Sequence, residues 1–140
     1  MTTEPSLVSV IDDDESVRES LPDLLRQFGF SAVAFASAEA FLESPLVGRT
    51  RCLVLDVAMP GMSGLDLLRV AREQDPFLPV VLLTAFATVE IAVAAMKEGA
   101  HDFLTKPVDT ERLLLVIGRA LEKRRMMTDN ILLKDELRER

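Results

Sequence analysis

Polar side chains that could do chemistry stand at the ends of four short apolar runs of this sequence. They are three carboxylates, a hydroxyl and an amine: Asp12, Asp13, Asp56, Thr84 and Lys106. Three carboxylates held together repel one another, and a divalent cation between them removes that repulsion. Mg²⁺ prefers such oxygen ligands beside phosphate, while a lysine and a hydroxyl suit phosphoryl oxygens. These residue types are the parts of a phosphoryl-transfer site, provided that the fold brings them together.

The runs that carry these residues alternate with segments of helical period. Short stretches rich in Val, Ile and Leu predict strands over residues 7–11, 32–35, 52–55, 79–84 and 102–105. Between them, apolar residues recur at three- and four-residue steps, which predicts helices over 16–28, 37–44, 65–74 and 88–98, and from 109 onward. Gly29 and Gly99 end two of these helices, and Pro45 ends a third.

Strict alternation of strands and helices predicts the α/β class, with one parallel sheet covered on both faces and right-handed crossovers. The runs CLVL and VVLL are apolar at every position, as expected of strands buried on both sides. In an open parallel sheet, ligands bind at the carboxyl ends of the strands. The polar residues that follow the strands are therefore expected to meet at one edge and form one site.

The composition fits one globular domain. The chain has 140 residues, of which 49% are apolar and 28% charged, with a mean hydropathy of +0.21. A net charge of −7 opposes a phosphate backbone, so direct nucleic-acid binding by this chain is not expected. The N-terminal MTTEPS resembles no export signal, and no apolar run approaches the roughly 18 residues of a membrane span. We therefore expect a cytoplasmic protein that does not enter a membrane.

The remaining chemically notable residues favour structural roles. A single cysteine, Cys52, and a single histidine, His101, exclude an intrachain disulfide and the common Cys/His zinc sites. We expect Cys52 to be buried in a strand and His101 to lie at the surface. Several aromatic residues are expected in or near the core, namely Phe28, Phe30, Phe35, Phe41 and Phe77.

Longer motifs surround the strand-end residues. They read Val10-Ile-Asp-Asp13, Leu53-Val-Leu-Asp56, Met59-Pro-Gly-Met-Ser-Gly64, Thr84-Ala85, and Gly99-Ala100 leading to Phe103-Leu-Thr-Lys106-Pro107. With them the sequence resembles the receiver domain of bacterial two-component response regulators, the CheY-like family. The resemblance covers residues 5–121 and implies a flavodoxin-like, doubly wound five-stranded sheet in the order 2-1-3-4-5 with five helices. Residues 122–140 are highly charged but keep a helical period, so they are expected to extend the last helix or to form a linker.

The resemblance implies a role for each acidic residue. Asp56 is the expected phosphoacceptor, and it would take its phosphoryl group from a phosphohistidine of a sensor histidine kinase. Asp13 and Asp56 are expected to bind Mg²⁺, or Mn²⁺, directly, together with the backbone carbonyl of Ala58. Asp12 is expected to complete the metal site by holding a metal-bound water.

Three further residues are implied to read the phosphorylated state. Lys106 would contact the phosphoryl group, and the peptide bond to Pro107 is usually cis in this family. Thr84 and Phe103 would be a switch pair, in which the hydroxyl moves toward the phosphoryl group and the ring turns into the vacated space. The surface of the fourth helix, fifth strand and last helix would change in response. The expected protein is thus a phosphorylation-controlled signalling switch and not an enzyme, with transcription regulation as its output.

Two other classes of similar topology are disfavoured, and a third stays open. Phosphatases with an aspartate nucleophile need a second Asp two residues after it, where this sequence has Ala58. Nucleotide- and flavin-binding modules need a turn rich in Gly or hydroxyls after the first strand, and Asp12-Asp-Asp-Glu15 would repel a phosphate there. The alternative that remains is a receiver that binds partners without being phosphorylated.

Two positions depart from the pattern common among receivers. Many relatives carry a polar side chain two residues after the acceptor and two after the switch threonine, where this chain has Ala58 and Phe86. Neither side chain can align an attacking water, so slow hydrolysis of the phosphoryl group is expected.

The C-terminal segment carries a short coiled-coil pattern. Met126, Asn130, Leu133 and Leu137 follow one another at steps of four, three and four. The pattern is too short to hold two chains unaided, so we expect a homodimer that also uses the fourth helix, fifth strand and last helix. The segment also resembles the helix that joins receivers to an effector domain, particularly in activators that carry an ATPase and work with an alternative sigma factor. The chain would then be either a stand-alone receiver or the N-terminal part of a transcriptional regulator.

Overall fold

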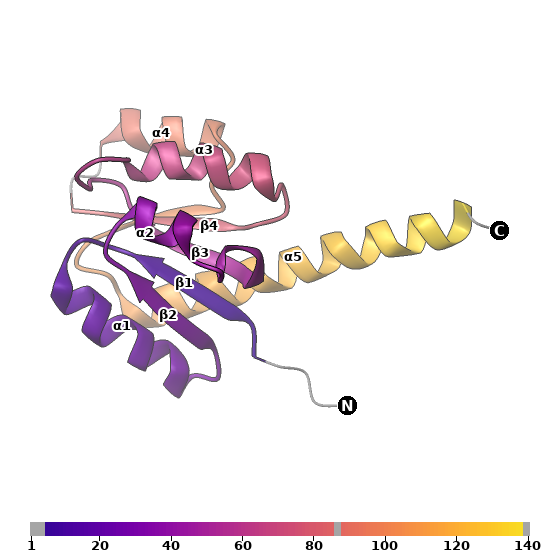
Figure 1. Ribbon diagram of the computed structural model, residues 1–140, viewed down its shortest axis with the longest axis horizontal. Helices are drawn as coiled ribbons and strands as arrows, with labels where there is room; N and C mark the ends of the chain where they lie inside the picture. The colour runs from indigo at the N-terminus through magenta and orange to yellow at the C-terminus, as the bar shows by residue number, and fades with distance from the viewer. Residues whose placement is uncertain (1–4, 86–87, 139–140) are drawn as a thin grey trace.

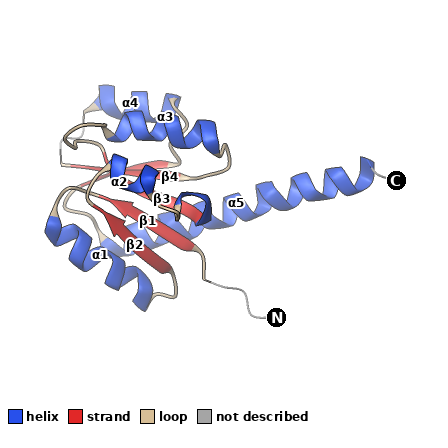
Figure 2. Ribbon diagram, viewed as in Figure 1, coloured by secondary structure: helices blue, strands red, loops and turns tan. Residues whose placement is uncertain are grey.

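The predicted α/β fold is present in the computed structural model, which describes residues 5–85 and 88–138, with side chains as far as Ile131. The strands are β1 (Leu7–Ile11), β2 (Ser31–Phe35), β3 (Thr50–Asp56), β4 (Val80–Thr84) and β5 (Asp102–Thr105). All are parallel, and they form one sheet in the order β2-β1-β3-β4-β5 (Figure 2). The fold class and the strand order are therefore confirmed.

Helices cover both faces of this sheet (Figure 1). They are α1 (Glu15–Gln27), α2 (Ala38–Glu43), α3 (Gly64–Gln74), α4 (Val89–Lys97) and α5 (Thr110–Arg138), with a short 3-10 turn, η1 (Val47–Arg49). One buried cluster joins α2, α3 and α4 to one face of the sheet, and a second joins α1 and α5 to the other. The β-branched and leucine side chains of the strands alternate between these two clusters, as the period of a strand requires.

Side-chain caps fix where the helices begin. Asp14 accepts a hydrogen bond from the Ser16 amide at 2.9 Å and begins α1. Ser63 and Asp66 form a capping box at the start of α3, and Thr88 caps α4. Because these caps lie in the loops that follow β1, β3 and β4, they also fix the loops that form the carboxyl edge of the sheet.

Strand β3 begins two residues earlier than its apolar run predicts. Thr50 is buried, and its hydroxyl lies 2.7 Å from the Ser9 hydroxyl and donates to the Leu46 carbonyl at 2.8 Å. A polar pair thus satisfies itself inside the sheet, and its hydrogen bonds permit burial that the residue types do not indicate.

The prediction for Phe28 was wrong, since its side chain is 61% exposed. Helical period places it on the same face as buried Leu25, but α1 ends at Gln27. The Phe28 backbone has left the helical conformation, at φ −98° and ψ 16°, so the period no longer directs the ring inward. Phe41 is buried as predicted, and the other aromatic residues named above are partly buried.

Helix α5 continues without a break from Thr110 to Arg138 and projects away from the sheet (Figure 1). Arg124 anchors it through an ion pair of 2.8 Å with Asp75, in the loop before β4. The side chains of Leu133 and Leu137 lie outside the described part of the chain. Within the described residues, no helix is long and apolar enough to cross a membrane.

Gly64 is the glycine that the fold most clearly requires. A Cβ there would overlap the Asp56 carbonyl and lie 2.7 Å from the Val57 Cα. Gly64→Ala should therefore lower the free energy of unfolding by about 1–3 kcal/mol, as overpacking does. Urea unfolding followed by circular dichroism measures this change.

Gly118 is the matched control for this prediction, since it lies inside α5 with nothing within 4 Å of an added Cβ. Gly118→Ala should raise the stability by up to about 1 kcal/mol, because alanine is the better helix former. Equal effects of the two substitutions would contradict the assignment of a close approach at Gly64.

Candidate functional site

Three strand ends bring an amine and two carboxylates together at the carboxyl edge of the sheet. Asp12 follows β1, Asp56 is the last residue of β3, and Lys106 follows β5. The Lys106 Nζ lies 2.7 Å from Asp12 Oδ2 and 3.4 Å from Asp56 Oδ2. Because β1 pairs directly with β3, with Ile11 beside Leu55, the two carboxylates are held as neighbours by the sheet itself.

Asp12 is held on all sides. It is only 1% exposed, and its amide donates to the Phe35 carbonyl at 3.1 Å. Its Oδ1 accepts from the Asp14 amide at 2.9 Å, while its Oδ2 accepts from Lys106. This carboxylate is fixed in place before any ligand arrives.

The environment of Asp56 disfavours its charge. It is 6% exposed, and burial, followed by the negative charge of Asp12, raises its pKa to about 6. The charge of Lys106 and a hydrogen bond of 3.2 Å from the Ala58 amide oppose this shift without cancelling it. In turn, Lys106 has a raised pKa: burial disfavours its charge, but Asp12 and Asp56 outweigh the effect of burial.

A cluster of carboxylates that could hold a cation includes both acids of this pair. Asp12, Asp13 and Asp56 can each direct a carboxylate oxygen to one point, with these oxygens within 4.8 Å of one another. Asp13 is exposed, so the cluster opens to solvent on that side. Three carboxylates against one lysine leave excess negative charge, and an all-oxygen, partly open set of donors fits Mg²⁺ with several waters retained.

Thr84 and Phe103 lie on adjoining strands next to this cluster. Thr84 ends β4, and its carbonyl accepts from the Lys106 amide at 2.8 Å. Phe103 pairs in register with Leu82 and is partly buried against the cluster under α2, α3 and α4. Side chains two apart on a strand share a face, so the buried Thr84 hydroxyl lies on the same face as Leu82. Phe86 lies outside the described residues.

The comparisons with known proteins identify the family of this chain. The family model described as the response regulator receiver domain matches residues 8–118. This chain belongs to the response regulator receiver family.

Individual relatives carry the likeness over nearly the whole chain. The response regulator protein TodT of Pseudomonas putida is 38% identical over 99% of this receiver chain. The C4-dicarboxylate transport transcriptional regulatory protein DctD of Rhizobium meliloti is 38% identical over 93% of it. The solved structure of the response regulator StyR has a TM-score of 0.86 at 39% identity and covers 98% of this chain and 69% of that one. This chain spans 61% of TodT and 28% of DctD.

Two supports of the receiver site were not predicted from the sequence. Glu39 of α2 accepts a hydrogen bond of 2.8 Å from the Met62 amide and so holds the loop after Asp56. In the same loop, Gly61 has a φ of +76°, a left-handed conformation that glycine adopts without strain. By contrast, the Lys106–Pro107 peptide bond is cis, as the resemblance implies.

Cys52 and His101 lie away from the receiver site. Cys52 is fully buried in β3, and burial raises the pKa of its thiol to about 12, which suits a structural residue. His101 precedes β5 at the opposite edge of the sheet and is partly buried, so the expected surface position was only partly correct. Burial, followed by the charge of Lys123, lowers the His101 pKa.

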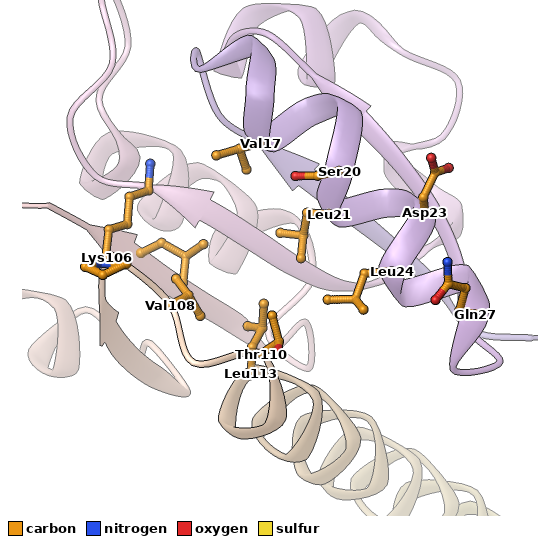
Figure 3. Close-up of a pocket in the computed structure, with 12 residues that line it drawn as sticks. Val17, Ser20, Leu21, Asp23, Leu24, Gln27, Lys106, Val108, Thr110 and Leu113 are labelled. Atoms are coloured by element: carbon orange, nitrogen blue, oxygen red, sulfur yellow. The ribbon is translucent and has the colours of Figure 1, made fainter.

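A largely apolar groove adjoins the receiver site (Figure 3). It has a volume of about 520 Å³ and lies between α1 and the start of α5. Val17, Leu21 and Leu24 line it from α1, and Val108 lines it from the loop before α5. Lys106 lines the groove and also contacts Asp12 and Asp56, so the groove and the acidic cluster share this residue.

The raised pKa of Asp56 predicts a pH-dependent stability. Asp56→Asn should stabilise the metal-free domain at pH 8 by about 2–3 kcal/mol, because it removes a carboxylate whose pKa is raised from 3.8 to about 6 by folding. The wild-type folded state binds this proton more tightly than the unfolded state. The advantage of the variant should therefore shrink as the pH falls from 6 toward 4. Urea unfolding in a chelator at several pH values measures the difference.

Excess Mg²⁺ is the control for this measurement. It should stabilise the wild type far more than Asp56→Asn and so reduce the gap at pH 8. If the difference in unfolding free energy between the wild type and Asp56→Asn depended on neither pH nor Mg²⁺, the ionised carboxylate would not be the cause of that difference.

Proposed function

We propose that this domain accepts a phosphoryl group on Asp56 from a phosphohistidine of a sensor histidine kinase. The observation that carries the proposal is the bridge of Lys106 between Asp12 and Asp56, beside a cluster of carboxylates that fits Mg²⁺. Asp56 is only 6% exposed, and it lies at the carboxyl edge of the sheet, where β3 ends and where a donor would approach in this proposal.

The transfer is a displacement at phosphorus. An Asp56 oxygen attacks the phosphorus, the bond from phosphorus to the imidazole nitrogen breaks, and the imidazole leaves with that electron pair. The product is an acyl phosphate on Asp56. Lys106 would pair with the new phosphoryl oxygens, and Asp12 and Asp13 would help to hold the metal. When bound, Mg²⁺ supplies positive charge that offsets the repulsion between the carboxylates and the incoming phosphoryl group.

Phosphorylation would act through Thr84 and Phe103. A phosphoryl group on Asp56 adds charge and hydrogen-bond acceptors one strand away from the Thr84 hydroxyl. As Thr84 turns toward it, space opens on the face where Phe103 is only partly buried, and the surface of α4, β5 and α5 repacks. The group shifts an existing equilibrium between two packings. In this proposal the protein is a switch that catalyses only its own phosphorylation and dephosphorylation.

The same surface is the proposed homodimer interface. The solvent face of α4 carries Val89, Val93 and Met96 at helical spacing, exposed by 77%, 46% and 52%. Leu115 of α5 is also exposed. A row of large apolar side chains on one surface is typical of an interface. Met126, exposed on the projecting part of α5, would extend the contact between two chains.

The proposed output is transcription regulation through an effector domain or a downstream protein. Transcriptional regulatory proteins are among the relatives, and this chain matches only part of their length. The continuous α5 would serve as the linker helix, as in the activator type of regulator. We expect the phosphoryl transfer to take place in the cytoplasm, because the kinase would draw its phosphoryl group from ATP.

Asp56 is predicted to be the sole phosphoacceptor. Incubation with radiolabelled acetyl phosphate and Mg²⁺ should label the wild type, and Asp56→Asn should abolish the label because the attacking oxygen is gone. Electrophoresis followed by autoradiography measures the result. Asp13→Ala should take up little label at low Mg²⁺ and recover at high Mg²⁺, since it loses a metal ligand but keeps the acceptor.

Two results would overturn this assignment. Undiminished label on Asp56→Asn would place the acceptor elsewhere. No label on the wild type under any condition would favour a receiver that binds partners without being phosphorylated.

Dimerisation through α4 is predicted to be separable from folding. Val93→Glu should weaken self-association by about tenfold or more, because it buries a charge in an apolar contact. Sedimentation of the full chain, with and without beryllofluoride, measures the association. A chain that ends at Leu121 should also associate more weakly. Phe28→Glu is the matched control, since Phe28 is exposed just after the end of α1 and its replacement should leave the dimer unchanged. A full chain that is monomeric in both states would contradict the dimer.

A further inference from the structure

Arg18 is a charged residue beside the acidic cluster to which the proposed chemistry gives no role. It lies in α1 and is partly buried. Its guanidinium Nη1 donates a hydrogen bond of 3.0 Å to the backbone carbonyl of Asp12. With this contact every polar group of Asp12 has a partner, since its amide, Oδ1 and Oδ2 are bonded to Phe35, Asp14 and Lys106.

The Asp12 carbonyl lies at the point where the hydrogen bonds between strands end. The Asp12 amide still donates to β2, but from Asp13 onward the backbone turns into α1. The Asp13 carboxylate must leave this turn directed toward Asp56 if the two are to share a cation. A hydrogen bond on the Asp12 carbonyl therefore fixes the peptide plane immediately before Asp13.

Two roles of Arg18 toward a cation have opposite signs. As a positive charge near Asp12, it would weaken the binding of a divalent cation by simple repulsion. As a support for the turn, it would strengthen that binding, because the ligands would need no rearrangement. The geometry favours support, since Arg18 bonds the carbonyl of Asp12 and leaves both carboxylate oxygens to other donors.

We propose that Arg18 is a positioning residue, which fixes the turn between β1 and α1 so that Asp12 and Asp13 face Asp56 before a cation binds. This inference rests on the proposed function of the acidic cluster. It assigns to α1 a part in the site as well as in the adjoining groove, since Val17 lines that groove and is the neighbour of Arg18.

The chain offers a matched control on the same helix. Arg26 is also in α1, and its Nη2 donates to the backbone carbonyl of Ala32 at 2.7 Å. Ala32 lies in β2, away from the acidic cluster. Arg18→Met and Arg26→Met each remove one positive charge and one hydrogen bond to a carbonyl, and both keep an apolar stem. Arg26→Met also removes an exposed ion pair of 2.9 Å with Asp23, and it acts away from the cation site.

The test measures Mg²⁺ affinity by nuclear magnetic resonance titration of the full chain. Arg18→Met should weaken Mg²⁺ binding by about tenfold, as the loss of a group that orients metal ligands does. Arg26→Met should leave the affinity unchanged. In the metal-free state, the Asp14 amide should exchange with solvent faster in Arg18→Met than in Arg26→Met, because that amide bonds the Asp12 carboxylate.

Each alternative has its own outcome. Unchanged or tighter Mg²⁺ binding in Arg18→Met would overturn the proposal and leave only the effect of charge. An equal loss in both variants would also overturn it, since general destabilisation would then suffice. These readouts need no phosphoryl transfer. If the wild type binds Mg²⁺ but takes up no label, the proposed function is wrong, and the Mg²⁺ titration still decides whether Arg18 positions the turn.

Discussion

The contact of Lys106 with both Asp12 and Asp56 is the interaction on which the candidate site depends. The amine joins residues 94 and 50 positions away in the sequence, and the shared carboxyl edge of one parallel sheet brings them together, although β5 is adjacent to neither β1 nor β3. Burial and the charge of Asp12 raise the pKa of Asp56, and the single positive charge of Lys106 does not cancel their effect. The metal-free site therefore favours the arrival of positive charge, and a divalent cation would relieve the repulsion that remains.

The central sheet connects this site to two surfaces with different properties. Toward α1 and the start of α5, Lys106 borders an apolar groove suited to a partner that approaches Asp56. Toward α3 and α4, Thr84 and Phe103 lie on the face whose outer helix carries the exposed Val93. The two surfaces share α5, since its start lines the groove and the same helix belongs to the proposed response surface. Because Lys106 contacts Asp56 and also lines the groove, a change of charge at Asp56 would in the proposed switch affect both sides of the sheet.

The strand ends were predictable because their signals are local. An apolar run followed by Asp12, Asp56 or Thr84 shows both the strand and the side chain that leaves it, and the rule for parallel sheets supplies the shared edge. The early start of β3 was not predictable, since the burial of Thr50 depends on a hydroxyl of β1 that is distant in sequence. The exposure of Phe28 depends on the residue at which α1 ends, and helical period alone does not determine that residue.

The supports of the site escaped prediction for a related reason. Arg18 and Glu39 act on backbone groups, and a backbone acceptor or donor leaves no mark in the sequence. Gly64 shows as part of a loop motif, but its need for a missing Cβ follows only from the approach of α3 to the end of β3. Side chains that contact ligands are thus easier to predict from the sequence than side chains that support the backbone around the site.

The projecting part of α5 is the feature that the domain itself stabilises least. Val116, Ile117 and Ala120 pack in the core, and Arg124 adds the ion pair with Asp75. Beyond that point Met126 and Ile131 are exposed, and a few isolated helical turns are marginal in water. The same helix packs beside β3 and β4 near its start, so its direction is set by the sheet that carries Asp56 and Thr84. In the proposed switch, a repacking of the α4, β5 and α5 surface would therefore alter the path of the projecting helix, and a local change of charge would become a displacement at a distance.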